Sequence, residues 1–217
     1  MNEPVLVGRS SSHFTRLARV FAVELDVPHV FRPVLDLTTL DPSAYGDNPA
    51  LKIPVLIDDE GPLYGAENVC GQLTRLAKAR QRVVLRGDVS DRLVVNAEEL
   101  TMHAMSSEVS LIMARGPNGE KTEPPKVRQS LQNCLEWLDQ RWDQVLGRLP
   151  DDRTISIVEA ALFCLVTHLP FRQIADVSGY ARLGAFCNGF GERPGAVQTQ
   201  YRFDAGAVGA PPPAPSA

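Results

Sequence analysis

The stretch Asn48-Pro49-Ala50-Leu51-Lys52-Ile53-Pro54-Val55-Leu56-Ile57 has the pattern of a loop that leads into a strand. Its last three residues are apolar, and two of them, Val55 and Ile57, are β-branched, as is typical of a strand. Turn residues follow at 58–61. A proline is tolerated at the first residue of a strand. Because an X–Pro bond adopts cis at modest cost, a cis Ile53–Pro54 bond would turn the Ile53 N–H and C=O outward, where they could pair with an extended peptide. On the proline alone, an ordinary trans bond is the commoner interpretation.

The composition is that of a globular protein with no strong surface field. The chain has 217 residues, enough for one large domain or two small ones, and 44% are hydrophobic. The formal net charge of −4 gives no attraction to nucleic acid or to an anionic membrane. No apolar run is long enough to span a membrane, and the N-terminus lacks the pattern of a secretory signal. We therefore expect a cytoplasmic protein.

The four cysteines are widely spaced and fall within helical patterns: Cys70, Cys134, Cys164 and Cys187. The sequence contains no CxxC pair and no Cys/His cluster, so we expect neither a metal site nor dithiol redox chemistry. Buried free thiols in a reducing compartment are the expected state.

The first eighty residues predict a small sheet with helices packed on it. Strands are expected at 5–7, 30–34, 54–57 and 63–64, with Pro33 favouring an edge position for the second. Apolar residues at helical spacing over 14–25 and 66–80 predict two helices, and 41–45 predicts a short turn or helix. The serines at 10–12 stand where an N-cap belongs. The order β-α-β-(α)-β-β-α indicates an α/β domain.

The rest of the chain predicts an all-helical unit. Residues 81–88 have no periodicity and are expected to be a linker, and no strand signal follows residue 90. Helices are expected over 90–115, 127–146, 157–168 and 180–192. Ser156 and Glu159 have the spacing of a capping box, and the helix that they open is apolar on all sides, hence buried. The tail at 205–217 is mostly Gly, Ala and Pro, so we expect it to be disordered.

Four sequence pieces in this order resemble the glutathione S-transferase family. The turn Ser12-His13-Phe14-Thr15-Arg16 is similar to that family's Ser-Pro-Phe-x-Arg, and residues 48–56 are similar to its Asn-Pro-x-Gly-Lys-Val-Pro-Val-Leu. Residues 156–159 resemble its Ser-x-x-Asp box, and residues 180–183 with Arg193-Pro194 resemble its closing pattern. The resemblance covers nearly the whole chain except the tail.

The resemblance implies a thioredoxin-like glutathione-binding domain at 1–82 and an all-helical domain at 88–204 that supplies the pocket for a second substrate. It implies a cis Pro54, the Ile53 main chain holding the cysteinyl part of glutathione, and Lys52 near a carboxylate of the tripeptide. Ser12, at a helix N-terminus, would donate a hydrogen bond to the sulfur and favour the thiolate. The partners implied are glutathione, a small hydrophobic electrophile and a second copy of the chain. No metal or nucleic acid is implied.

Three residues depart from the family pattern. The family carries an acidic residue and a serine where its third helix begins, and Gly65 and Ala66 stand there in this chain. Glu67 and Asn68 follow directly and could hold the γ-glutamyl end if the turn is shifted. Leu51 also replaces the usual glycine.

Each of these site residues has a simpler interpretation as well. Ser12 could be only an N-cap, with Ser11 as the fallback donor, and Lys52 and Glu67 could be a surface charge and a residue that favours the helix dipole. His13 could line the site, but an exposed loop position is the expected one. For the second-substrate pocket we name Ser11, His13, Met102 and His103, although a helical methionine stripe with Met105 is more often core.

The predicted function is conjugation of the glutathione thiolate to a small electrophile by a serine-type transferase. Two alternatives stay open. One is a transferase-like protein that binds without efficient catalysis, which the Gly65-Ala66 pair motivates. The other is a glutathione-dependent isomerase, which would use the same site.

Overall fold

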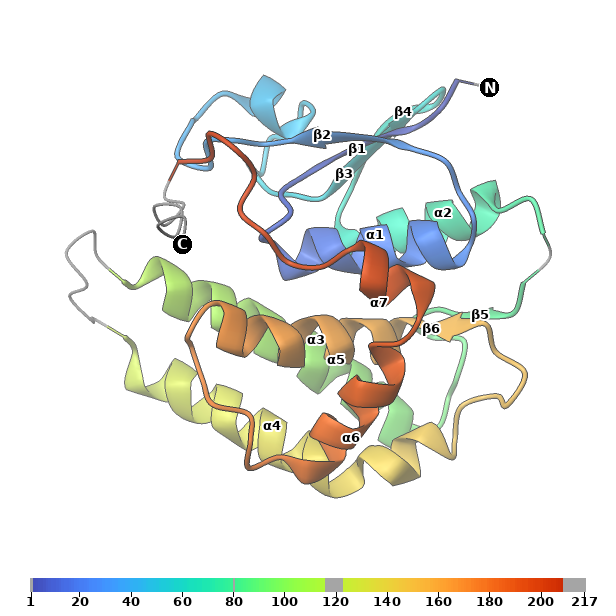
Figure 1. Cartoon of the computed structure of the whole chain (residues 1–217), viewed down its shortest axis with the longest axis vertical. Coiled ribbons are helices and arrows are strands. Elements are labelled where there is room, and N and C mark those ends of the chain that lie inside the picture. The colour runs from blue at the N-terminus through green and yellow to red at the C-terminus, as the bar shows by residue number, and fades with distance from the viewer. Residues whose placement is uncertain (1, 80, 116–122, 209–217) are drawn as a thin grey trace, which may run out of the picture.

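A computed structural model describes residues 2–79, 81–115 and 123–208, shown in Figure 1. The N-terminal region has the α/β order that the sequence predicts. Its elements are β1 (Val5–Gly8), α1 (His13–Glu24), β2 (Val30–Pro33), the 3-10 helix η1 (Pro42–Tyr45), β3 (Val55–Asp58), β4 (Gly61–Tyr64) and α2 (Ala66–Leu76). This is a thioredoxin-like sheet with helices, and the prediction of the fold class is confirmed.

The sheet has the order β2-β1-β3-β4, so β2 is an edge strand, as its proline predicts. Strands β1 and β2 are parallel, whereas β3 is antiparallel to both β1 and β4. Val55 pairs with Val7 on one side and with Tyr64 on the other. The residues that follow β1, precede β3 and follow β4 therefore meet at one end of the sheet.

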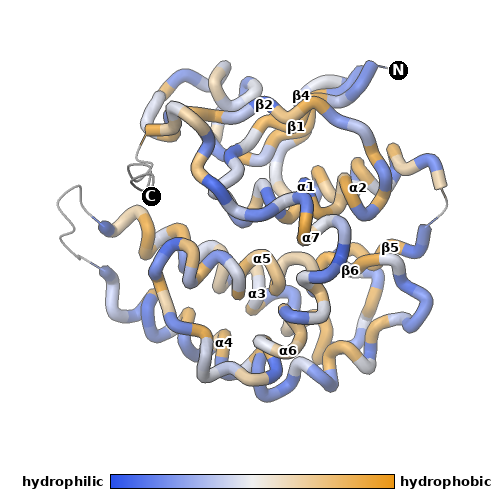
Figure 2. The backbone as a smooth tube through the Cα atoms, viewed as in Figure 1, coloured by the Kyte–Doolittle hydropathy of each residue, from blue (hydrophilic) through white to orange (hydrophobic). Residues whose placement is uncertain are grey.

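Helix α1 lies between the sheet and the helical region (Figure 1), and it packs against α2. Its apolar face, with Leu17 and Phe21 fully buried, joins a core that continues into the C-terminal helices. Figure 2 shows much of β1 in the orange of hydrophobic residues. The opposite face of the sheet carries a smaller cluster in which Tyr45 of η1 covers Val7 and Val55. Because both faces of β1 are buried, its position in the sheet is fixed. The start of α1, which follows β1 after a short turn, is held in place as well.

The C-terminal region is helical, as predicted. Its elements are α3 (Arg92–Met113), α4 (Pro125–Leu146), α5 (Ile157–Phe171), α6 (Ala181–Phe190) and α7 (Pro194–Gln198). The central helix is α5, which packs against α1, α3 and α6. Ser156 caps it, because the Ser156 Oγ accepts from the Glu159 N–H at 3.3 Å. Trp142 of α4 and Met105 of α3 are fully buried, so both are core residues.

The structure corrects three sequence expectations. Residues 83–84, expected in a linker, form β5 (Val83–Val84), which pairs in parallel with β6 (Ile155–Ser156), although no strand was expected after residue 90. Helix α2 ends at Leu76, short of residue 80, and the short helix α7 was not predicted. A two-residue strand and a five-residue helix are too short to carry a hydrophobic period.

The expected disorder of the tail falls mainly on residues 209–217, which lie outside the described residues. Residues 205–208 are described, and the Val208 N–H donates to the Leu35 carbonyl at 2.8 Å. Among the described helices, none is both long enough and apolar enough to cross a membrane.

Candidate active site

Ser12 is the N-cap of α1. Its Oγ accepts a hydrogen bond from the Thr15 N–H at 3.3 Å, and its backbone has the extended conformation of a cap residue. A hydroxyl has two lone pairs and one proton, so accepting from Thr15 leaves the Ser12 O–H available as a donor. Gly8, at the end of β1, is packed so closely against Thr15 that a Cβ would lie 2.3 Å from a Thr15 methyl carbon. That close approach sets the turn that carries Ser12.

Ile53 and Pro54 lie at the same end of the sheet as Ser12, just before the first paired residue of β3. The Ile53–Pro54 peptide bond is cis. Within the described residues the β3 pairings begin at Val55, so the main chain of Ile53 is outside the ladder. The Lys52 side chain is exposed, and the Lys52 carbonyl accepts from Asn48 Nδ2 at 2.8 Å. The Asn48 amide thus holds the loop that presents Ile53.

The N-terminus of α2 is the third segment at this end of the sheet. Gly65 is its N-cap, with a φ of 89° that disfavours a side chain, and no side chain caps the helix. Ala66 is buried, and Asn68 Nδ2 donates to the Tyr64 carbonyl at 2.9 Å. An uncapped helix N-terminus offers free N–H groups and a partial positive charge to an anion. This N-terminus therefore has the chemistry to bind an anion through its backbone groups.

Glu67 is engaged elsewhere. Its Oε1 accepts from Arg86 at 3.3 Å, and Arg86 also pairs with Glu99. A cavity of about 300 Å³ beside α2 is lined in part by Glu67 and Arg86. Glu98 is nearby in this charge cluster, and burial raises its pKa to about 7. The Glu67 carboxylate is thus part of the junction between the two regions.

The segment after α7 lies against the turn that precedes Ser12. The Asp204 carboxylate accepts from the Ser10 N–H at 2.8 Å, and the Val208 carbonyl accepts from Arg9 at 2.6 Å. Phe203 stacks on Phe171 of α5 with the ring centroids 5.1 Å apart. The C-terminal segment therefore fixes one side of the serine turn.

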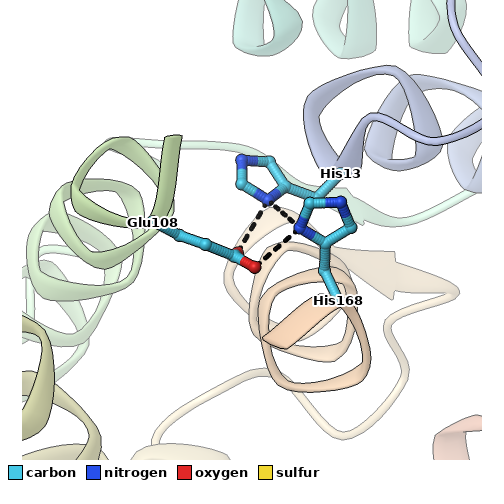
Figure 3. Close-up of side chains that lie close together, drawn as sticks. All are labelled: His13, Glu108 and His168. Atoms are coloured by element: carbon cyan, nitrogen blue, oxygen red, sulfur yellow. Dashed lines mark hydrogen bonds and ion pairs between the residues drawn. The ribbon is translucent and has the colours of Figure 1, made fainter. Parts of the chain in front are cut away.

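His13 does not lie in an exposed loop, as the sequence suggested: only 1% of it is exposed. Its Nδ1 lies 3.0 Å from Glu108 Oε2 and 2.9 Å from His168 Nδ1 (Figure 3). The triad is completed by a 2.8 Å contact between His168 Nδ1 and Glu108 Oε1. The expectation was wrong because the residues that cover His13 come from α3 and α5, 95 and 155 positions away.

The charge state of this triad follows from its burial. Burial lowers the pKa of His13, against the opposing effect of its bond to Glu108. Burial alone would raise the pKa of Glu108, but its bonds to the two histidines outweigh this and hold the pKa below the usual range. The favoured state therefore has an ionised Glu108 and a neutral His13.

The residues named for a second-substrate pocket are dispersed. Ser11 is buried, and its carbonyl oxygen accepts from His168 Nε2 at 2.9 Å. Met102 is partly buried against the core, whereas His103 is exposed and bonds to Ser130 of α4 at 2.8 Å. Helix α4 packs on the far side of α3 from α1 (Figure 1), so His103 and His13 do not meet.

Sequence reasoning missed Glu108 and His168. A signal for Glu108 was present, because it falls four residues after Ala104 and three before Leu111, on the buried face of α3. His168 lies in the last turn of a helix that is otherwise almost entirely apolar. Charged or titratable residues at such positions need a partner, and the partner was in another element.

Comparison with known proteins adds to this geometry. The model of the family described as glutathione S-transferase, N-terminal domain, matches residues 6–81. No curated protein matches the chain. Solved structures do: a glutathione S-transferase from Methylobacillus flagellatus with glutathione bound is 21% identical, covers 92% of this chain and 100% of its own, and has a TM-score of 0.75.

Two further structures have the same fold. A glutathione transferase family member from Pseudomonas fluorescens with bound glutathione is 20% identical, with 92% of this chain and 100% of that chain covered and a TM-score of 0.73. Gtt2 from Saccharomyces cerevisiae is 12% identical, with 90% of this chain and 99% of that chain covered and a TM-score of 0.68. Residues 6–81 thus form an N-terminal domain of the glutathione S-transferase family, and the chain as a whole has the two-domain fold of that family.

Proposed function

We propose that this protein is a glutathione transferase that conjugates the glutathione thiolate to a small electrophile. One observation carries the proposal: three groups lie at the same end of the sheet. They are the Ser12 hydroxyl, the Ile53 main chain outside the described ladder, and the N-terminus of α2, which no side chain caps. Two of the solved structures with this fold carry glutathione, by their descriptions.

Each of the three segments suits one part of glutathione, which is a short peptide. The Ile53 N–H and C=O suit the cysteinyl backbone, since an extended peptide gains affinity by pairing with free main-chain groups. The α2 N-terminus suits the γ-glutamyl carboxylate, because exposed helix N–H groups bind anions. Lys52 provides a further positive charge for a carboxylate. Residues 1–82 would then bind glutathione and residues 88–204 would supply the pocket for the electrophile.

The chemical step needs a charged sulfur. A thiol with a pKa near ~8.5 is mostly protonated at neutral pH, and lowering that pKa by about two units corresponds to roughly 2.7 kcal/mol of anion stabilisation. The Ser12 O–H and the α1 dipole both act in this direction. The proton passes to solvent, the sulfur forms a bond to an electrophilic carbon, and the displaced group, such as a halide, leaves with the bonding electrons.

The alternative is a protein that binds glutathione, or a related peptide, without efficient turnover. The observation in its favour is that Gly65 and Ala66 provide no side-chain hydrogen bond to the γ-glutamyl end. An isomerase that uses glutathione would share the binding site and differ only in the second substrate.

Calorimetric titration with glutathione, alongside a conjugation assay with an aryl halide, separates these functions. We expect one saturable site per chain with a Kd below about 1 mM and measurable conjugation. Lys52→Ala should weaken binding about three- to ten-fold, as expected for the loss of one partly screened charge pair. Lys78→Ala, which removes another exposed lysine beyond the C-terminal end of α2, is the matched control and should leave the Kd unchanged.

Saturable binding without turnover on any electrophile would favour the binding protein. No binding at millimolar glutathione, in a chain that circular dichroism shows to be folded, would overturn the proposal.

A further inference from the structure

We propose that His13, Glu108 and His168 bind a divalent transition-metal ion in the interior of the protein, between α1, α3 and α5. The three side chains are 0–3% exposed and converge from three separate elements (Figure 3). One nitrogen from each histidine and a carboxylate oxygen all lie within 4.8 Å of one another. This proposal does not depend on the binding of glutathione.

The first argument is a count of protons. The His168 Nε2 faces the Ser11 carbonyl, which only accepts hydrogen bonds, so the Nε2 must carry the proton. The His168 Nδ1 is then the nitrogen that faces the triad, and it lies 2.8 Å from the carboxylate oxygen Glu108 Oε1. A proton or a metal ion must lie between these two atoms.

The second argument distinguishes a metal from a proton. Three contacts of 2.8, 2.9 and 3.0 Å join His13 Nδ1, His168 Nδ1 and the two Glu108 oxygens in a closed ring. A proton on each Nδ1 would serve both contacts to Glu108, but the 2.9 Å contact between the two Nδ1 atoms would then bring two donors face to face. A metal ion accepts electron pairs from all the donors at once, which satisfies every member of the ring.

The third argument is the spacing. An octahedral ion with bonds of about 2.1 Å holds adjacent ligands about 3.0 Å apart, whereas a tetrahedral ion with the same bonds holds them about 3.4 Å apart. The observed contacts, 2.8–3.0 Å, are closer to the octahedral spacing, with each Nδ1 beside a different oxygen of Glu108. Two histidines and one carboxylate are a donor set suited to divalent first-row ions.

The surroundings of the triad also fit. The Ser11 carbonyl fixes the tautomer and the ring plane of His168, the role that a hydrogen-bonded backbone group has behind a metal-bound histidine. The aromatic rings of Phe14, Phe171 and Tyr201 pack around the two imidazoles and keep water out. Arg172 adds a positive charge nearby that disfavours a bound cation. We therefore expect moderate affinity for the metal ion, with a Kd of about 10 µM.

The consequence for the protein is a cross-link between its two regions. The first residue of α1, directly after Ser12, would be joined through the metal to α3 and α5. A metal ion that binds the folded chain but not the unfolded chain raises the free energy of unfolding by mass action. We therefore expect the metal to stabilise the fold and to hold the serine turn.

The test uses the full chain without an affinity tag, incubated separately with excess Zn²⁺, Mn²⁺ or Fe²⁺, desalted and analysed for metal by plasma mass spectrometry. We expect about one ion per chain for at least one of these metals, and a lower thermal midpoint after treatment with a chelator. Glu108→Gln and His168→Asn should each reduce the bound metal at least ten-fold, as expected for the loss of a ligand. His103→Asn, a histidine of α3 that bonds to Ser130 outside the triad, is the control and should retain the metal.

Three results would overturn the proposal. The first is wild-type protein that is folded by circular dichroism yet holds less than about a tenth of an equivalent of Zn²⁺, Mn²⁺ and Fe²⁺ alike. The second is metal content that survives in Glu108→Gln and His168→Asn. The third is a thermal midpoint that the chelator leaves unchanged in the wild type. If the two triad variants do not fold, the chelator and metal-content measurements on the wild type decide.

Discussion

Ser12→Ala is expected to lower the rate of glutathione conjugation at least ten-fold, the scale of a lost hydrogen bond to charge in a transition state. The Ser12 hydroxyl has its acceptor side occupied by the Thr15 N–H and its proton free for the glutathione sulfur. The measurement is kcat with an aryl halide at saturating glutathione, so that a change in glutathione affinity does not enter. The pKa of bound glutathione, read from thiolate absorbance, should rise in the same variant.

The same substitution removes an N-cap, which costs about 1 kcal/mol of stability. Ser156→Ala is the matched control, since the Ser156 Oγ also accepts from the backbone N–H three residues on, at the same 3.3 Å, and opens α5 instead. Ser156→Ala should lose at least as much stability, because the Ser156 O–H also donates to Glu159 Oε2, and should keep its kcat. If the two variants lose the same small fraction of their rate, Ser12 is only a cap, and Ser11→Ala becomes the next variant to measure.

Arg16→Met is expected to lower the free energy of unfolding by about 3 kcal/mol, because it leaves buried acceptors without their charged donor. Arg16 is 5% exposed, and its guanidinium donates to Thr167 of α5 at 2.9 Å and to the Ala196 carbonyl of α7 at 3.1 Å. It also lies over the rings of Phe163 and Tyr201, 4.7 and 4.3 Å from their centroids. One side chain of α1 thus connects α5, α7 and the C-terminal segment.

Urea unfolding of Arg16→Met and of Arg75→Met measures this effect. Arg75 is exposed near the end of α2, and its guanidinium bonds to Gln72 within the same helix, so its replacement should change the free energy by less than about 0.5 kcal/mol. Equal changes in the two variants would show that the contacts of Arg16 do not contribute to stability.

Much of the fold was predictable because it depends on local patterns. The apolar face of α1, the edge position of β2 and the cap at Ser156 each follow from residues within one or two turns of each other. The order of these elements then restricts the topology, since a strand-helix-strand unit followed by a hairpin has few ways to form one sheet.

The buried triad was not predictable in the same way. His13, Glu108 and His168 are separated by 95 and by 60 positions, and no spacing pattern links residues so far apart. The composition of the serine turn predicts a polar, exposed loop, because it does not show that α5 and the segment at Asp204 cover this turn. The cap at Ser12 depends on one helix and was predicted, whereas Glu108 and His168, which meet His13 from two other helices, were missed.

The most direct test of the central claim is a crystal structure of the protein soaked with glutathione. The account predicts density for the tripeptide at the end of the sheet, with its cysteinyl amide groups paired to the Ile53 main chain, its sulfur within hydrogen-bond distance of Ser12 Oγ and a carboxylate at the N-terminus of α2. Well-ordered density for these three segments with no tripeptide between them, in a crystal soaked at millimolar glutathione, would contradict it.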